Sequence, residues 1–455
     1  MDFGPTDDTS PVLARPPRFH GRLPFREFLR RIKESSIATW PEEAFESAFL
    51  ERRILWRRTF VANSPDTIGH VLLDNAENYT KSRIARRLLE PGIGRGLITS
   101  EGAQWRRERR LLAPAFQHQR IAGYSGAIVA AASRMLAAWE STTAPLDMAK
   151  AMSRLTLAII SDIMFSAGDD PEIAKFGAAV DRYQTMVRPS VLDLLNLPDW
   201  LPRRSLARAT ALFTESDAVI ADLIARRRAA PDPGSDLLGL LLGAATAGDA
   251  PLSAQEIRNQ VATILTAGHE TTANALTWTW YLLALHPAVE AKLHEEIDHV
   301  LAGRQPGFDD IARLVYARMV IEEAMRLYPP VHTLSRSALA DDEIAGHRVP
   351  AGSTVLIVPW LLHRHRRLWQ DPDRFMPERM SPERAAGRPR FAYIPFGAGP
   401  RICIGASLAM TEAILIIASV ARQWRLRLIA TPPVEPIGLI TLRPRQPMMM
   451  RLEKR

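Results

Sequence analysis

The sequence of 455 residues has a formal net charge of +8, and 24% of its residues are charged while 47% are hydrophobic. This length and composition are typical of a folded chain with a large core and exclude a wholly disordered one, and the single cysteine excludes an intramolecular disulfide. The basic residues form no dense block with interleaved aromatics, so we expect no nucleic-acid partner.

Helical periodicity dominates the chain. Residues 1–20 are polar and rich in proline, and we expect this segment to be flexible. A short strand at 59–62 precedes a helix that begins at Ser64 and Pro65, and the pattern from about 100 to 301 is helical with intervening loops. After residue 328 we expect strands at 344–349 and 354–358 around a turn at 350–352, a helix over 405–424, and strands at 425–428, 438–443 and 448–452. The sequence therefore predicts a mainly α protein with a small β-region (α+β), formed by one large helical domain over 21–455.

An apolar run at 261–285 is long enough to raise the question of a membrane span. His269 and Glu270 interrupt it near its middle, where a charge inside a bilayer is costly. We interpret the run as a buried core helix and expect no transmembrane anchor. The N-terminus lacks a basic stretch followed by an apolar one, so we expect no secretory signal and a cytoplasmic location.

The only cysteine, Cys403, lies in the stretch Phe396-Gly-Ala-Gly-Pro-Arg401-Ile-Cys403-Ile-Gly, directly before a predicted helix. Its two leading glycines permit positive φ, and the start of a helix favours a thiolate, the form that binds a soft metal. A dinucleotide loop would need a third glycine at Ile402, a phosphate loop would need a following Lys-Ser/Thr, and a cysteine nucleophile would need a base that the sequence does not identify. From the local chemistry alone these alternatives remain open.

The middle of the apolar run reads Ala267-Gly-His269-Glu270-Thr271-Thr. An acid and hydroxyls inside such a helix are costly without partners, and they suit a widened helix turn beside a ligand that needs protons. The simpler alternative is that the threonine hydroxyl bonds back to a carbonyl of its own helix. A zinc site of the His-Glu-x-x-His type is excluded because position 273 is alanine.

The stretch from Phe396 to Gly405 resembles, at every fixed position, the haem-binding signature Phe-Gly-x-Gly-x-Arg-x-Cys-x-Gly of the cytochrome P-450 superfamily. The resemblance implies a soluble, bacterial-type haem-thiolate monooxygenase with haem b, and it extends over about 55–455. Cys403 would be the axial iron ligand, Phe396 would pack beside the thiolate, and Arg401 would bind a haem propionate.

Other segments resemble further elements of this family. The stretch 267–272 is similar to its oxygen-activation motif, which implies that Thr271 hydrogen-bonds iron-bound dioxygen species and that Glu270 relays protons. The family's Trp-x-x-x-Arg element and a later arginine imply propionate binding, and its Glu-x-x-Arg element with a third arginine implies a buried structural charge network. The matching residues are Trp105, Arg109 and Arg336 for the propionates, and Glu323, Arg326 and Arg379 for the network.

The resemblance implies insertion of one oxygen atom from O2 into a lipophilic substrate, such as a fatty acid, terpenoid or steroid. A separate ferredoxin or flavoprotein, linked to an NAD(P)H reductase, would supply electrons by docking on Arg106, Arg107 and Arg110 of a protein expected to be monomeric. A peroxide-driven peroxygenase and a non-catalytic haem protein are the alternatives, and neither requires the pair Glu270 and Thr271. The segments that would contact substrate are 88–97, 188–204, 264–271, 331–334 and 438–441, which are mostly apolar.

Overall fold

The computed structural model describes residues 13–55, 57–166, 171–195, 197, 200–201, 204–229, 234, 236–246, 252–429 and 433–455. The α-helices are α1 Phe25–Glu34, α2 Pro65–Gly69, α3 Arg83–Ile93, α4 Gly102–Leu112, α5 His118–Glu140, α6 Met148–Phe165, α7 Pro171–Met186, α8 Val191–Leu194, α9 Arg204–Ala229, α10 Leu237–Thr246, α11 Ala254–Leu285, α12 Pro287–Leu301, α13 Val315–Leu327, α14 Pro359–Leu362, α15 Pro382–Ala386 and α16 Ala406–Ala421. The strands are β1 Phe49–Ile54, β2 Arg57–Ala62, β3 Tyr79–Lys81, β4 Leu146–Asp147, β5 Leu334–Ala338, β6 Asp342–Ile344, β7 His347–Val349, β8 Thr354–Ile357, β9 Trp424–Leu428, β10 Pro436–Gly438, β11 Leu442–Pro444 and β12 Met449–Lys454.

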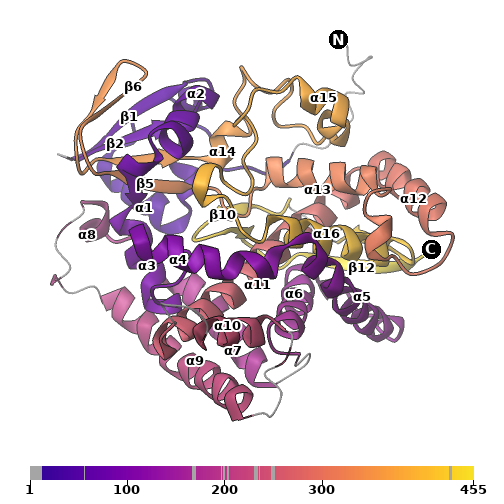
Figure 1. The fold of residues 1–455 in the computed structure, drawn as a ribbon. Coiled ribbons are helices and arrows are strands. Elements are labelled where there is room, and N and C mark those ends of the chain that lie inside the picture. The colour runs from indigo at the N-terminus through magenta and orange to yellow at the C-terminus, as the bar shows by residue number, and fades with distance from the viewer. Residues whose placement is uncertain are drawn as a thin grey trace.

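The strands and helices occupy different parts of the molecule. A five-stranded sheet has the order β1-β2-β8-β5-β3, in which β2 and β8 are parallel and the other neighbours are antiparallel. Figure 1 shows β1, β2 and β5 gathered at one side, with α7, α9 and α10 grouped below the central helix α11. The predicted mainly α fold with a small β-region is confirmed.

Helix α11 forms the centre of the helical part and packs on α6, α13 and α16. It begins with a capping box in which Ser253 accepts a hydrogen bond from the Glu256 backbone, and the Glu256 side chain bonds back to the cap. Most of its side chains are buried on all sides, including Trp278 and Tyr281. A helix that is apolar around its whole circumference belongs in a core, so the interpretation of 261–285 as a core helix is confirmed.

Within the described residues, α5 is the helix whose length and composition would allow it to cross a membrane, although only 28% of its most apolar window is buried. Its inward side chains, among them Ile121, Ile128 and Leu136, belong to the main core cluster. Because α5 packs on α16 and α6 through this face, its apolar composition has a structural explanation.

Two predicted strands are each split by a turn in the structure. The strand expected at 344–349 is a hairpin of β6 and β7, because Ala345 and Gly346 adopt positive φ of 51° and 76°. The following strand β8 pairs with β5 and β2 and not with β7, so the turn at 350–352 connects strands of two different sheets. The strand expected at 438–443 is likewise the hairpin of β10 and β11.

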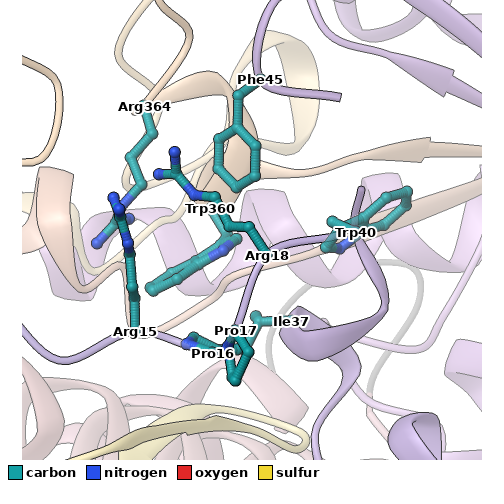
Figure 2. A pocket seen from close by; sticks show the side chains of 9 residues that line it. All are labelled: Arg15, Pro16, Pro17, Arg18, Ile37, Trp40, Phe45, Trp360 and Arg364. Carbon is teal, nitrogen blue, oxygen red and sulfur yellow. The ribbon is translucent and has the colours of Figure 1, made fainter. Parts of the chain in front are cut away.

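The N-terminal segment contacts the body of the protein where it is described. Residues 1–12 of the segment expected to be flexible lie outside the described residues. In the following stretch Leu13 is buried, and Arg18 forms ion pairs with Glu42 (3.1 Å) and Asp373 (2.8 Å). Figure 2 shows Arg15 and Arg18 beside a cavity of about 10 Å³, whose lining contains none of the predicted cofactor residues. Burial of Leu13 and the ion pairs of Arg18 attach this stretch to the body of the protein, and the flexibility expected for 1–20 stays a prediction.

Candidate active site

The cysteine loop has the backbone geometry that its sequence predicts. Gly397 and Gly399 adopt φ of 73° and 67°, and a Cβ on Gly399 would lie 1.8 Å from the Leu72 carbonyl oxygen. The loop closes through a hydrogen bond from the Cys403 backbone N–H to the Phe396 carbonyl (2.9 Å). Glycine is thus required at 399 both for its conformation and for the close backbone approach.

The surroundings of the Cys403 thiol determine whether it ionises. Its side chain is accessible, yet so many protein atoms surround it that burial raises the pKa of the thiol. The Gly405 N–H and the Arg109 charge act in the opposite direction and are weaker. The Gly405 N–H at the start of helix α16 acts in the predicted direction, but burial outweighs it, so a bound cation would be needed to stabilise the anion.

A cluster of buried cations lies beside the cysteine loop. Arg336 donates one hydrogen bond, to the Ser335 carbonyl (3.1 Å), and burial lowers its pKa to about 10. Lys81 pairs across the sheet with Arg336, and burial lowers the pKa of Lys81 to about 7. Arg401 bonds to Glu101 and to the Ser100 carbonyl (2.9 Å).

Trp105 and Arg109 join this cluster from α4. The Arg401 guanidinium lies 4.2 Å from the centre of the Trp105 ring, and Arg109 donates to the Ile402 carbonyl at 2.7 Å. The structure therefore brings Trp105, Arg109, Arg336 and Arg401 to the same place as Cys403. We call Lys81, Arg109, Arg336 and Arg401 the cation cluster.

The cation cluster has too few carboxylates. Glu101 is the only acidic residue that contacts these cations through ion pairs or charge in the described part of the chain. Buried cations in excess are unfavourable unless an anionic ligand accompanies them. The two propionates of haem would supply the missing negative charge, and its metal would bind the Cys403 thiolate. The residues present therefore fit haem.

The predicted structural charge network is confirmed. Arg326 binds both carboxylate oxygens of Glu323 at 2.7 and 2.8 Å, and Arg379 binds one of them at 2.9 Å. The remaining Arg326 donors reach the carbonyls of His363, Pro372 and Arg374. These three side chains are almost fully buried, and each charge has a partner.

The middle of helix α11 is mostly buried, and it contains the polar residues that the sequence analysis singled out. Thr271 is half-buried, and its hydroxyl donates to the Ala267 carbonyl at 2.6 Å, as the simpler alternative requires. The helix is regular over Ala254–Leu285 without a widened turn, which corrects that expectation. Thr156 of α6 donates to the His269 carbonyl at 2.8 Å. Gly268 allows Ile160 to approach, since a Cβ there would lie 3.0 Å from that side chain.

Glu270 is buried and bonded to residues that the sequence analysis did not single out. Its Oε1 accepts hydrogen bonds from the Thr441 hydroxyl and from Arg443 Nη2 (2.5 Å), both on the β10–β11 hairpin. Burial raises the pKa of Glu270, and the Arg443 charge opposes this effect without cancelling it. The carboxyl can therefore carry a proton nearer to neutral pH than an ordinary glutamate.

Three of the five segments predicted to contact substrate contribute to one cluster, whereas Leu334 of 331–334 packs in another. Leu88, Leu97, Ile264 and Ile440 pack in the same hydrophobic cluster as Ile404, which follows the cysteine. The expected segment 188–204 lies partly outside the described residues, at 196, 198, 199, 202 and 203. The described walls near α11 are thus mostly apolar, as binding pockets usually are.

Sequence reasoning missed Lys81, Glu101 and Arg443, and it placed Thr441 only in a segment expected to contact substrate. No local pattern marks their partners, since each contact joins elements that are distant in the sequence. The excess of arginines over acids at the predicted propionate positions was the one available signal that a carboxylate such as Glu101 lies nearby.

Comparisons with known proteins give a consistent assignment. A family model described as Cytochrome P450 matches residues 43–450. Cyclooctatin synthase of Streptomyces melanosporofaciens is 38% identical over 396 residues, which cover 85% of this chain and 84% of that protein. Cyclooctat-9-en-7-ol 5-monooxygenase of the same organism is 36% identical over 386 residues, with 83% and 82% coverage.

The structural comparison agrees with these similarities. The crystal structure of the haem domain of cytochrome P450DA matches with a TM-score of 0.80 at 28% identity, and the match covers 98% of both chains. The structural match and the family model both extend over nearly the whole chain, and both agree with the expected haem-thiolate fold. The family model includes the cysteine loop. The chain therefore belongs to the cytochrome P450 family and is a haem-thiolate monooxygenase.

Proposed function

We propose that this enzyme hydroxylates a terpenoid by reductive activation of O2, with electrons from a separate donor protein. The observation that carries the proposal is the buried Glu270 carboxyl beside Thr271 in the middle of α11, a pair that neither a peroxygenase nor a haem carrier needs. The relatives support the substrate class, because one of them is named for oxidation of the terpenoid cyclooctat-9-en-7-ol.

Haem would be held by residues at the two sides of its pocket. Cys403 is the only sulfur that can serve as a thiolate ligand, and the cation cluster with Trp105 would neutralise and position the propionates. Phe396 would shield the thiolate. When bound, thiolate-ligated haem iron supplies the oxidising chemistry, since the sulfur pushes electron density toward O–O cleavage.

Glu270 and Thr271 would handle the protons that oxygen activation consumes. The raised pKa of Glu270 keeps a share of its carboxyl protonated, so that it can both give and regain a proton through water. The Thr271 hydroxyl now donates to Ala267, and rotation about its χ1 angle would direct the same hydrogen toward oxygen.

The electron donor would dock on the exposed part of α4. Arg106 and Arg110 are exposed, and Arg106 is 3.0 Å from the exposed Glu77, whereas Arg107 is engaged by Glu256. The predicted docking surface therefore consists mainly of Arg106 and Arg110. A ferredoxin or flavoprotein with an acidic face fits this charge, and the enzyme would act as a cytoplasmic monomer.

The decisive test is spectroscopic and kinetic. The reduced enzyme with carbon monoxide is expected to show the red-shifted absorption of sulfur-bound haem, and C403A is expected to lose both this band and turnover. Among fatty acids, steroids and terpenoids, a terpenoid is expected to give the largest shift of the Soret band toward high spin. Faster turnover with hydrogen peroxide alone than with reductant, or no spectral response to any terpenoid, would contradict the proposal.

A further inference from the structure

The acid on α11 is held by a hairpin that is itself firmly anchored. The backbone N–H of Gly438 donates to Ser35 Oγ at 2.9 Å, and His332 Nε2 lies 2.9 Å from the Leu439 carbonyl oxygen. Asn274 of α11 donates to the Thr441 hydroxyl at 3.3 Å. The backbone of the hairpin is therefore fixed. The side chains of Thr441 and Arg443 project from it and hold the acid of α11, and we call these two side chains the hairpin anchor.

The hairpin anchor faces two sets of acceptors, one on α11 and one on α7. Thr441 Oγ1 contacts Glu270 and also Gln184 Oε1 (3.3 Å), yet a hydroxyl has one hydrogen to donate. Arg443 Nη2 lies 2.5 Å from Glu270, 3.3 Å from Gln184 Oε1 and 3.7 Å from Asp181 Oδ1. The acid of α11 thus shares both donors with two residues of α7.

Helix α7 also forms part of the apolar wall. Its buried side chains Phe176, Val180 and Tyr183 belong to the same cluster as Ile264 of α11. The Tyr183 hydroxyl donates to the Leu88 carbonyl at 2.5 Å, which links α7 to a segment predicted to contact substrate. A small movement of α7 changes the distances from Asp181 and Gln184 to the hairpin anchor while the hairpin stays fixed.

We infer that Thr441 and Arg443 are positioning residues that hold the Glu270 carboxyl, and that Asp181 and Gln184 on α7 compete for the same donors, so that the position of α7 sets when Glu270 is free to deliver protons. The inference rests on the proposed proton role of Glu270. An ion pair of half-buried Arg443 with Glu270 opposes release, and the half-exposed Asp181 is the group able to take over the guanidinium.

A double-mutant cycle of D181N and R443Q in the haem-loaded enzyme tests this competition, with R443K as the variant that keeps the charge. D181N is expected to slow turnover on the order of tenfold, which is within the range of coupling energies between contacting residues. It is also expected to raise the solvent isotope effect on turnover and to leave the substrate-binding constant unchanged. When the enzyme already carries R443Q, adding D181N is expected to change turnover no further. When it carries R443K instead, D181N is expected to slow turnover again in part. The matched control is E172Q, which removes an exposed α7 carboxylate that pairs with Lys175.

An infrared measurement provides a readout besides turnover. The band that disappears in E270Q identifies the Glu270 carboxyl. This band is expected to shift in R443Q and to stay in place in E172Q. Thermal unfolding checks that the variants are folded. Equal effects of D181N in both backgrounds, or an unshifted band in R443Q, would overturn the inference. If E270Q itself leaves turnover unchanged, the proposed proton role fails and the inference with it; if E270Q slows turnover and D181N does not, only the competition fails.

Discussion

Two groups of buried and half-buried cationic side chains differ in how their charges are balanced. In the first, Arg326 and Arg379 share the carboxylate of Glu323 and direct their other donors at carbonyls. In the second, the cation cluster contains four cations, and Glu101 is the one acid near them among the residues that the structure describes. The first group is complete in the protein alone, whereas the second becomes complete only when an anionic ligand arrives.

The difference shows how charge balance distinguishes structural from ligand-binding arginines. A guanidinium with a bidentate carboxylate and filled carbonyl contacts stabilises the fold as it stands. A buried cation whose pKa is lowered by burial costs stability that a ligand can recover. Variants in the two groups should therefore separate protein stability from haem retention.

The largest effect is expected for R326M in the first group. Removing one member of a buried pair leaves Glu323 without its main partner, which costs about 3–5 kcal/mol in the free energy of unfolding. Urea denaturation with and without haem measures this loss. R348M, which removes an exposed pair with Asp341, is the control and is expected to change little. A tolerated R326M would show that the first group is not a structural element.

In the second group R336M is expected to affect haem much more than the polypeptide. Loss of one hydrogen-bonded charge costs about 2 kcal/mol, or about 30-fold in haem affinity. Without haem the variant should be as stable as the parent or more stable, because an unbalanced buried charge has been removed. Haem transfer to apomyoglobin and thermal unfolding of the haem-free protein check the two effects. Equal destabilisation in both forms would remove the distinction between the groups.

The cation cluster also predicts a dependence of stability on pH. In the haem-free protein burial lowers the pKa of Lys81 from 10.5 to about 7, so between these values the unfolded chain binds a proton that the folded protein does not. Stability of the haem-free protein should therefore rise as the pH increases through this window. The slope should be smaller in K81M and in the haem-bound enzyme. Denaturation midpoints at several pH values measure it, and identical slopes in K81M would contradict the assignment.

The smallest effect concerns an exposed arginine, which belongs to neither buried group. R110E is expected to slow reduction by an acidic donor about three- to tenfold at low salt and to leave stability unchanged. The difference should vanish at high ionic strength, since exposed charges are screened. Stopped-flow reduction measures the rates, with R425E on β9 as the control. An effect that persists in high salt would point to a structural role for Arg110.

Much of the site followed from residues that are close in the sequence. The positive φ of Gly397 and Gly399, the start of α16 after Cys403 and the pair of Glu323 with Arg326 all depend on local spacing. Local spacing was less informative for strands. The hairpin turn at Ala345 was missed because alanine rarely adopts positive φ, and the residue gave no sign of a break.

The sequence by itself determined the helical architecture, the cysteine loop and the polar middle of α11, because periodicity, glycine conformation and helix capping act over a few residues. Only the tertiary structure decided that Lys81 lies opposite Arg336, that Arg443 meets Glu270 across 173 positions of the chain, and that Asp181 lies 3.7 Å from Arg443. Such contacts depend on strand register and on how α7 packs over α11. Buried charges then interact strongly because little water separates them, so their pairing, and with it the chemistry of the acid, emerges only when the chain is folded.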